Sequence, residues 1–172
     1  MSTILRFKFK KFILIHILLF LIASLLGFLT GNLTRKIEKI TFFNKSFSEY
    51  FLHNLTICLF IILIGIFTLG YFLWIFMLMN GYVLGSAIGM LNIEFQTVDI
   101  IYLFIHGIFE LPALFLAVYI GKYISHLIVE SIFRNSQLLQ KRPIKIILFL
   151  LFIMVFLLLI ASIIESLPKI GG

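Results

Sequence analysis

His106 and Glu110 stand four residues apart within a long apolar segment. On a helix, residues four apart share one face, so this spacing brings an imidazole and a carboxylate together. A charged residue at the centre of a bilayer costs roughly 2.5–3.5 kcal/mol, and such residues are usually functional. Pro112 lacks a backbone N–H and crowds the carbonyl of Ile108, so we expect a loosened helix beside the carboxylate.

Glu165, near the end of the last apolar segment, provides a second carboxylate. One imidazole and two carboxylates could hold a zinc ion with an open position for water. His106, Glu110 and Glu165 are therefore the candidate metal-binding and catalytic residues. The sequence has no H-E-x-x-H motif, and His53 is the one spare histidine expected on the same side of the membrane.

A mechanism without metal is also open. Glu110 could act as a general base, and the amide of Asn54 or Asn80 could donate to an oxyanion. The opposite interpretation is structural, with His106 and Glu110 as a satisfied polar pair. Polar contacts between membrane helices contribute about 0.6–2 kcal/mol each.

The composition excludes a soluble domain. Hydrophobic residues make up 62% of the 172 residues and charged residues 12%, and the mean hydropathy is +1.19. We therefore predict an all-α, polytopic transmembrane helical bundle forming a single membrane domain. The formal charge of +7 fits topology and lipid headgroups, and no nucleic acid is expected as a partner. Cys58 stands alone, so it forms no internal disulfide.

Five apolar stretches have the length of a membrane span, about 20 residues. The sequence predicts them near residues 12–29, 53–70, 72–92, 100–129 and 144–166. Residues 30–52 mix charged and apolar positions, which predicts an extracytoplasmic connector. It is either an amphipathic helix lying on the membrane surface or a solvated connector with a few apolar contacts. A basic stretch precedes the first span as in a signal peptide, but we expect a retained helix.

The break between the second and third spans has two readings. A short turn near Gly70 is favoured, while Asn80-Gly81 is also a good turn pair and would leave a short re-entrant piece. Small residues spaced by four predict close helix packing. The glycine stripe consists of Gly81, Gly85 and Gly89. Its expected partner is a stripe of small residues on the fourth span, Ala113, Ala117 and Gly121.

The basic residues predict the orientation, with the N-terminus and residues 130–143 in the cytoplasm. Lys122, near the inner end of its span, is expected to reach the headgroups. A rise of about 1.5 Å per residue then places the polar side chains in the outer half of the membrane, with Glu110 near the centre. This arrangement predicts a polar cavity open to the outside, lined by His53, Asn54, Asn80, His106, Glu110 and Glu165.

The segment from Ile105 to Ala113 resembles the signature of the stage II sporulation protein M family. The family motif reads Pro-His-Gly-Ile-Phe-Glu-Leu-Pro-Ala, and this chain differs at its first position, where Ile105 replaces proline. Asn54, Gly65, the Asn80-Gly81-x-x-x-Gly85 element and the Ala161-x-x-x-Glu165 ending are also similar, so the resemblance covers residues 50–166.

The resemblance implies a multi-pass protein of a bacterial plasma membrane. The family's namesake acts with partner proteins in engulfment during sporulation, and other relatives are associated with circular-bacteriocin maturation, secretion or immunity. Three functions stay open: a component of a membrane assembly, an intramembrane zinc-dependent hydrolase or peptide ligase, and a transporter or immunity subunit for an apolar peptide. The last would need an ATPase partner, because the chain has no Walker motif.

Overall fold

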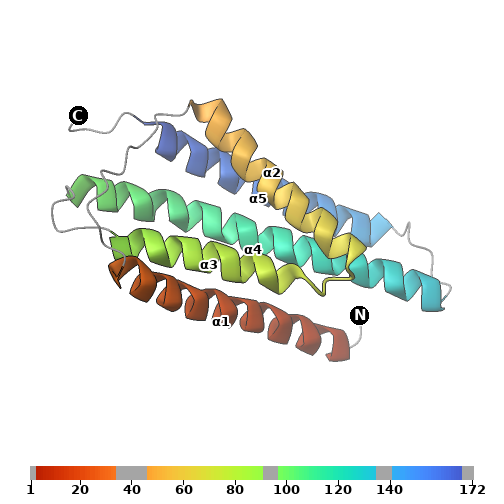
Figure 1. Cartoon of the computed structure of the whole chain (residues 1–172). Helices are drawn as coiled ribbons and strands as arrows, with labels where there is room; N and C mark the ends of the chain where they lie inside the picture. The colour runs from red at the N-terminus through yellow and green to blue at the C-terminus, as the bar shows by residue number, and fades with distance from the viewer. Residues whose placement is uncertain (1–2, 34–45, 91–96, 135–140, 168–172) are drawn as a thin grey trace. The chain divides into compact units, whose positions relative to one another are not determined.

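The computed structural model describes residues 3–33, 46–90, 97–134 and 141–167. Every secondary-structure element in these ranges is a helix (Figure 1). The helices are α1 (Thr3–Leu33), α2 (Phe47–Phe67), α3 (Leu73–Met90), α4 (Thr97–Arg134) and α5 (Lys141–Ser166). All five are long and apolar enough to cross a membrane. The prediction of an all-α fold with five spans is confirmed, and the protein is a multi-pass membrane protein.

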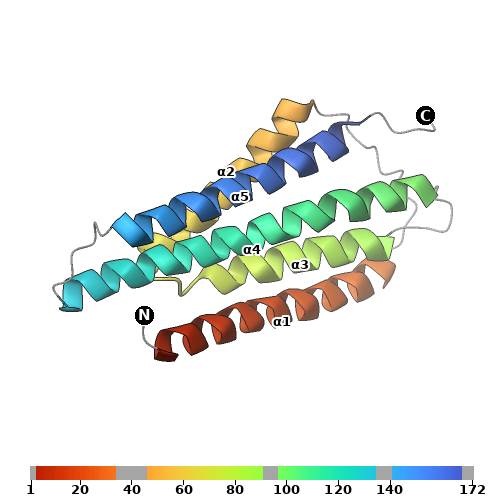
Figure 2. The same ribbon diagram turned by 180° about the vertical axis from the view of Figure 1, so that it is seen from behind.

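The helices form two compact units, where the sequence predicts a single bundle. The first unit contains α1 and α3, which lie side by side and run in the same direction (Figures 1 and 2). A Cβ added to Gly81 would meet Phe20 and Ala23, while Gly85 faces Ser24 and Gly89 faces Phe28. Each later residue of α3 thus contacts a later residue of α1, so the two helices run parallel.

The prediction that the glycine stripe packs against the small residues of the fourth span is therefore wrong. Gly81, Gly85 and Gly89 lie against the backbone of α1, not against the alanines of the fourth span. Gly27 and Gly31 of α1 complete the contact by lying against Tyr82 and Ser86. With glycines on both helices the backbones approach closely, a contact that larger side chains would prevent.

The second unit contains α2, α4 and α5. Helix α4 contacts both α5 and α2, and α2 also contacts α5. Figure 2 shows α5 running antiparallel to α4, whereas Gly121 and Ser125 of α4 meet Ile62 and Gly65 of α2. The core of this unit consists of small and aliphatic side chains from all three helices: Ile61, Ala113, Ala117, Ile120, Met154, Leu158 and Ala161, all fully buried.

Helix α2 begins six residues before the predicted position 53, at Phe47. Its N-cap is Ser46, which forms a capping box with Glu49: the Ser46 N–H donates to the Glu49 carboxylate at 2.6 Å, and the Glu49 N–H donates to the Ser46 hydroxyl at 3.4 Å. This reciprocal bonding satisfies donors that a helix start leaves free. Residues 46–52 therefore belong to α2 and not to the expected connector, whose residues 34–45 lie outside the described ranges.

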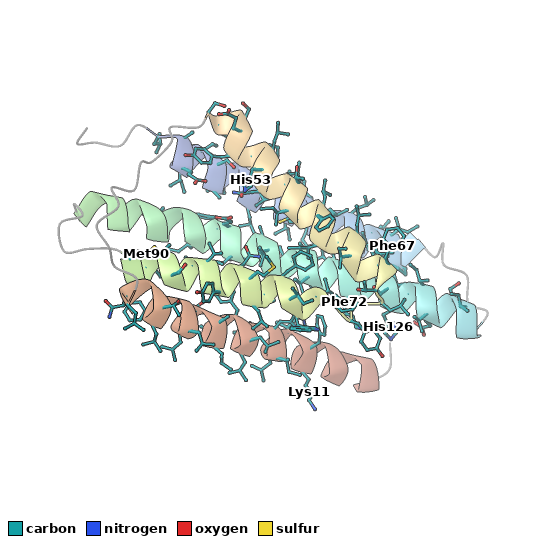
Figure 3. All side chains as sticks on the ribbon, viewed as in Figure 1. Lys11, His53, Phe67, Phe72, Met90 and His126 are labelled. Carbon is teal, nitrogen blue, oxygen red and sulfur yellow. The ribbon has the colours of Figure 1, made fainter. Side chains whose placement is uncertain are left out.

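The chain turns between α2 and α3 at residues 68–72, so the alternative break at Asn80-Gly81 does not occur. Leu69 and Gly70 have φ angles of 52° and 79°, and the Gly70 N–H donates to the Gly65 carbonyl at 2.8 Å. A residue of positive φ commonly ends a helix in this way. Phe67 and Phe72 mark the two ends of the turn in Figure 3.

Candidate functional site

Glu110 lies on the face of α4 that packs within the α2, α4 and α5 unit. Positions three, four and seven residues further on, namely Ala113, Leu114 and Ala117, share this face and are at most 4% exposed. Glu110 itself is half-buried. Its carboxylate lies close enough to α2 to act electrostatically on the thiol of Cys58.

Glu110 lies within the part of α4 that is apolar and long enough to cross a membrane, Gly107–Ile132. A carboxylate inside such a segment is costly unless other groups solvate it. In the structure Glu110 has at least one hydrogen-bonding or electrostatic partner.

Asn54 lies one helical turn from Cys58, on the same buried face of α2. Its side chain is 7% exposed. A carboxamide both donates and accepts hydrogen bonds, so this position supplies a neutral polar group on the packed face of α2.

Glu165 continues the buried face of α5. Met154, Leu158, Ala161 and Ser162 on this face are fully buried, and Glu165 follows Ala161 by four residues. Its side chain is half-buried and has polar interactions of its own. Each of the three helices thus presents one polar side chain, Asn54, Glu110 or Glu165, on the face that packs within the unit.

The remaining predicted site residues fall elsewhere. His106 belongs to α4, one turn before Glu110, but its side chain lies outside the described part of the structure. His53 is exposed on α2 (Figure 3). Asn80 belongs to α3 in the other unit, where its amide donates to the Phe76 carbonyl of the same helix at 2.8 Å. The unit described here therefore holds Asn54, His106, Glu110 and Glu165.

The chain matches the model of a known protein family. The family model of stage II sporulation protein M matches residues 12–167. The chain belongs to this family. The match extends beyond residues 50–166, where the resemblance is visible by eye, and includes most of α1. The searches of curated proteins and of solved structures found no match.

A metal site in this family member would need three ligands that converge. Among the side chains that the structure describes, no three His, Cys, Asp or Glu residues are grouped closely enough to hold a metal ion. Glu110 and Glu165 thus do not form such a site with any other described side chain. The zinc hypothesis depends on His106, whose side chain the structure does not describe, and it stays a prediction.

Two polar residues of α4 have roles that the sequence did not predict. The Lys122 ammonium donates to the Leu69 carbonyl at 2.9 Å, and its side chain covers Gly70. The Ser125 hydroxyl lies 2.5 Å from the Gly65 carbonyl and 2.6 Å from the Gly121 carbonyl. Lys122 thus binds the turn after α2, instead of reaching for headgroups, and a cation there complements the helix dipole.

Farther along α4, His126 and Glu130 form a pair at the end of the helix. The His126 Nδ1 lies 3.8 Å from a Glu130 carboxylate oxygen, and both side chains are about one-third exposed. They are four and five turns beyond Glu110, so they do not belong to the site around that carboxylate.

Proposed function

We propose that the chain is a bacterial plasma-membrane component of a multi-protein membrane assembly, of the stage II sporulation protein M type. The assembly acts in sporulation-like engulfment or in the maturation or secretion of a circular bacteriocin. The functional site of the chain is an outward-facing polar cavity around Asn54, His106, Glu110 and Glu165. Partner proteins or an apolar peptide meet the chain there.

The observation that carries this proposal is the half-buried Glu110 within an apolar helix long enough to cross a membrane. An apolar residue at this position would cost nothing in lipid, whereas a carboxylate costs roughly 2.5–3.5 kcal/mol. In the proposed cavity the Asn54 amide donates to the carboxylate and offsets part of this cost. Groups that are kept against such a cost act as hydrogen-bonding contacts, and membrane assemblies use them to hold helices together.

Two other functions use the same residues. As an intramembrane metal-dependent peptidase or peptide ligase, the chain would use His106, Glu110 and Glu165 to bind zinc and activate water. As a peptide transporter or immunity subunit, it would bind the peptide at the cavity and take energy from an ATPase subunit.

The test is to isolate the chain from its native membranes in a mild detergent and measure the size and the composition of the complex. Membership of an assembly predicts a species larger than the chain alone. Glu110→Gln keeps a hydrogen bond and should preserve this species, whereas Glu110→Leu should reduce it at least tenfold. Glu130→Gln, at the other end of α4, is the control and should leave it unchanged.

Metal analysis of the same preparations separates the alternatives. About one zinc per chain, lost in both His106→Ala and Glu110→Gln, would establish the enzyme reading. An ATPase that co-purifies in stoichiometric amount would establish the transporter reading. A chain that is recovered alone and metal-free, although folded, would contradict the proposed assembly.

A further inference from the structure

The charged residues of the α2, α4 and α5 unit separate toward its two ends. Helices α2 and α4 run parallel from one end, and the antiparallel α5 finishes there (Figure 2). The sequence has no lysine or arginine from Ser46 to Gly121 or from Ile146 to Pro168. The lysines and arginines of the three helices therefore all lie toward the other end. We call the first end the acidic end, after its carboxylates Glu49, Asp99, Glu110 and Glu165.

Asn54 adds a second, independent feature at the acidic end. Its side chain is 7% exposed, and it shares the buried face of α2 with Cys58, one turn away. Glu110 acts electrostatically on the same Cys58 from α4, so Asn54 and Glu110 both lie near this thiol. Within the part of the chain that the structure describes, no hydrogen bond is recorded for the Asn54 carboxamide.

The carboxamide oxygen of Asn54 therefore calls for a donor. In the proposed cavity one amide N–H donates to Glu110, but the oxygen is an acceptor and still needs a donor of its own. Buried polar atoms in proteins are almost always hydrogen-bonded. The oxygen and the Glu110 carboxylate are both acceptors, and a hydrogen bond between ionised groups is stronger than one between neutral groups. The group that suits both acceptors is a positively charged donor.

A lysine ammonium matches these acceptors best. Its three N–H donors point in different directions and can bond to oxygens on separate helices, whereas the planar guanidinium of arginine matches the two oxygens of one carboxylate. The surface of α4 next to Glu110 is apolar, with Ile105 38% exposed and Ile108 63% exposed. A lysine stem can lie along such a surface while its ammonium reaches a polar group.

We propose that the acidic end binds a lysine side chain from an apolar segment of another polypeptide, with the ammonium between the Asn54 oxygen and the Glu110 carboxylate. A lysine in a membrane segment is as costly alone as Glu110 is, so each group offsets the cost of the other. An aminophospholipid offers the same ammonium, but its phosphate would bring a negative charge to an end whose carboxylates repel it. The inference deepens the proposed function and rests on it, because it names the chemistry of the partner at that site.

Carbodiimide coupling tests this contact directly. N,N′-dicyclohexylcarbodiimide enters membranes and activates a carboxyl group, and an amine in contact then displaces the urea to form an amide bond, with a net loss of one water. Native membranes that contain the full chain are treated with the reagent, and the coupled peptides are identified by mass spectrometry. The expected product joins Glu110 to a lysine in an apolar segment of another polypeptide.

Matched variants control the coupling. Glu110→Gln cannot be activated, so the coupled product should fall at least tenfold although the assembly persists. Glu130→Gln, at the other end of α4, should leave the product unchanged. Asn54→Leu removes the amide oxygen and should lower the coupling yield at least threefold, whereas Asn54→Asp keeps an oxygen acceptor and should retain the yield.

Charge reversal gives a second readout. Glu110→Lys places a like charge against the partner lysine, so the amount of the assembly should fall at least tenfold. Changing the identified partner lysine to Glu should restore the assembly. Restoration also separates the contact from misfolding, because a change in the partner would not rescue a chain that fails to fold. An assembly that Glu110→Lys leaves intact, or that the partner change does not restore, would contradict the proposal.

Other coupling products overturn the proposal. These are an amide between Glu110 and an aminophospholipid, an amide with a lysine of this chain such as Lys45, or no amide at all in membranes from which the assembly is recovered. In each case the inference about lysine fails while the proposed function stands. If the wild-type chain is recovered alone, the proposed function itself fails.

Discussion

Ser125 couples two helices through a single hydroxyl group. The residue is 1% exposed, and its hydroxyl can donate to Gly65 of α2 or to Gly121 of its own helix. The Gly65 carbonyl also receives the Gly70 N–H. The Ser125 hydroxyl is therefore a contact between α4 and the end of α2, in an environment from which water is excluded.

We expect Ser125→Ala to lower the free energy of unfolding by about 1 kcal/mol, the scale of an interhelical hydrogen bond in a membrane protein. The measurement is equilibrium unfolding of the purified chain in mixed detergent micelles. Ser162→Ala is the matched control, because Ser162 is equally buried but its hydroxyl donates to Leu158 of the same helix at 2.8 Å. Equal losses in both variants would show that the contact with Gly65 contributes nothing.

The sequence predicts which residues belong to the site better than it predicts the groups that they contact. Charge in an apolar segment is visible in any single sequence, so Glu110 and Glu165 are found by reading along the chain. The bonds of Lys122 and Ser125 join positions 53 and 60 residues apart. No local pattern encodes such a pair, and a lysine near the end of a span looks the same whether it contacts a carbonyl or a headgroup.

At the scale of the helices, hydrophobic length was the reliable signal. A run of apolar residues of about 20 positions must be a span, because unpaired backbone groups are not tolerated in lipid. The start of α2 carries a further signal in the sequence, since Ser46 and Glu49 have the spacing of a capping box. The partner of the glycine stripe was not predictable, because a small face can pack against any other small face.

The capping box gives a prediction for α2. Ser46→Ala removes the side chain that accepts the Glu49 N–H, which should cost about 1 kcal/mol of local helix stability. Amide hydrogen exchange in the first turn, residues 47–50, should become faster by about fivefold, while the centre of α2 is unchanged. Thr56→Ala is the control, because the Thr56 hydroxyl bonds only to Leu52 within the helix among the contacts described. Unchanged exchange in the first turn would mean that the cap is not formed.

The contact between α1 and α3 gives a second prediction for the helices. In Gly85→Ala the added Cβ would overlap the Ser24 backbone, so the helices must separate. We expect a destabilisation of about 1–3 kcal/mol, the usual cost of overpacking. The thermal unfolding midpoint of the purified chain measures it, and Gly107→Ala, with no atom near the added Cβ, is the control. A Gly85→Ala chain as stable as Gly107→Ala would contradict the close approach of α1 and α3.

For the whole molecule, the directions of the helices limit the topology. A chain that crosses the membrane at every helix has α1 parallel to α3, and α2 parallel to α4. Contacts within the first unit make α1 and α3 parallel, and within the second unit α2 and α4 advance together from Ile62 and Gly121 to Gly65 and Ser125. The parallel α1 and α3 require the intervening chain to return across the membrane, which α2 does if it is a full span.

The orientation that follows is open to a direct test. With the basic N-terminal end in the cytoplasm, Lys11 and Lys145 should be inside, and Ser48 and Leu167 outside. All four side chains are exposed, so each can be changed to cysteine singly. A membrane-impermeant maleimide should label Ser48→Cys and Leu167→Cys in intact cells, and Lys11→Cys and Lys145→Cys only after permeabilisation.

Cys58 is buried and should stay unlabelled, which makes the wild-type chain the control. Labelling of Lys11→Cys together with Lys145→Cys in intact cells would invert the orientation and would place the mouth of the proposed cavity around Glu110 in the cytoplasm. Labelling of Lys11→Cys and Ser48→Cys from the same side would instead mean that α1 does not cross, so that the chain has four spans.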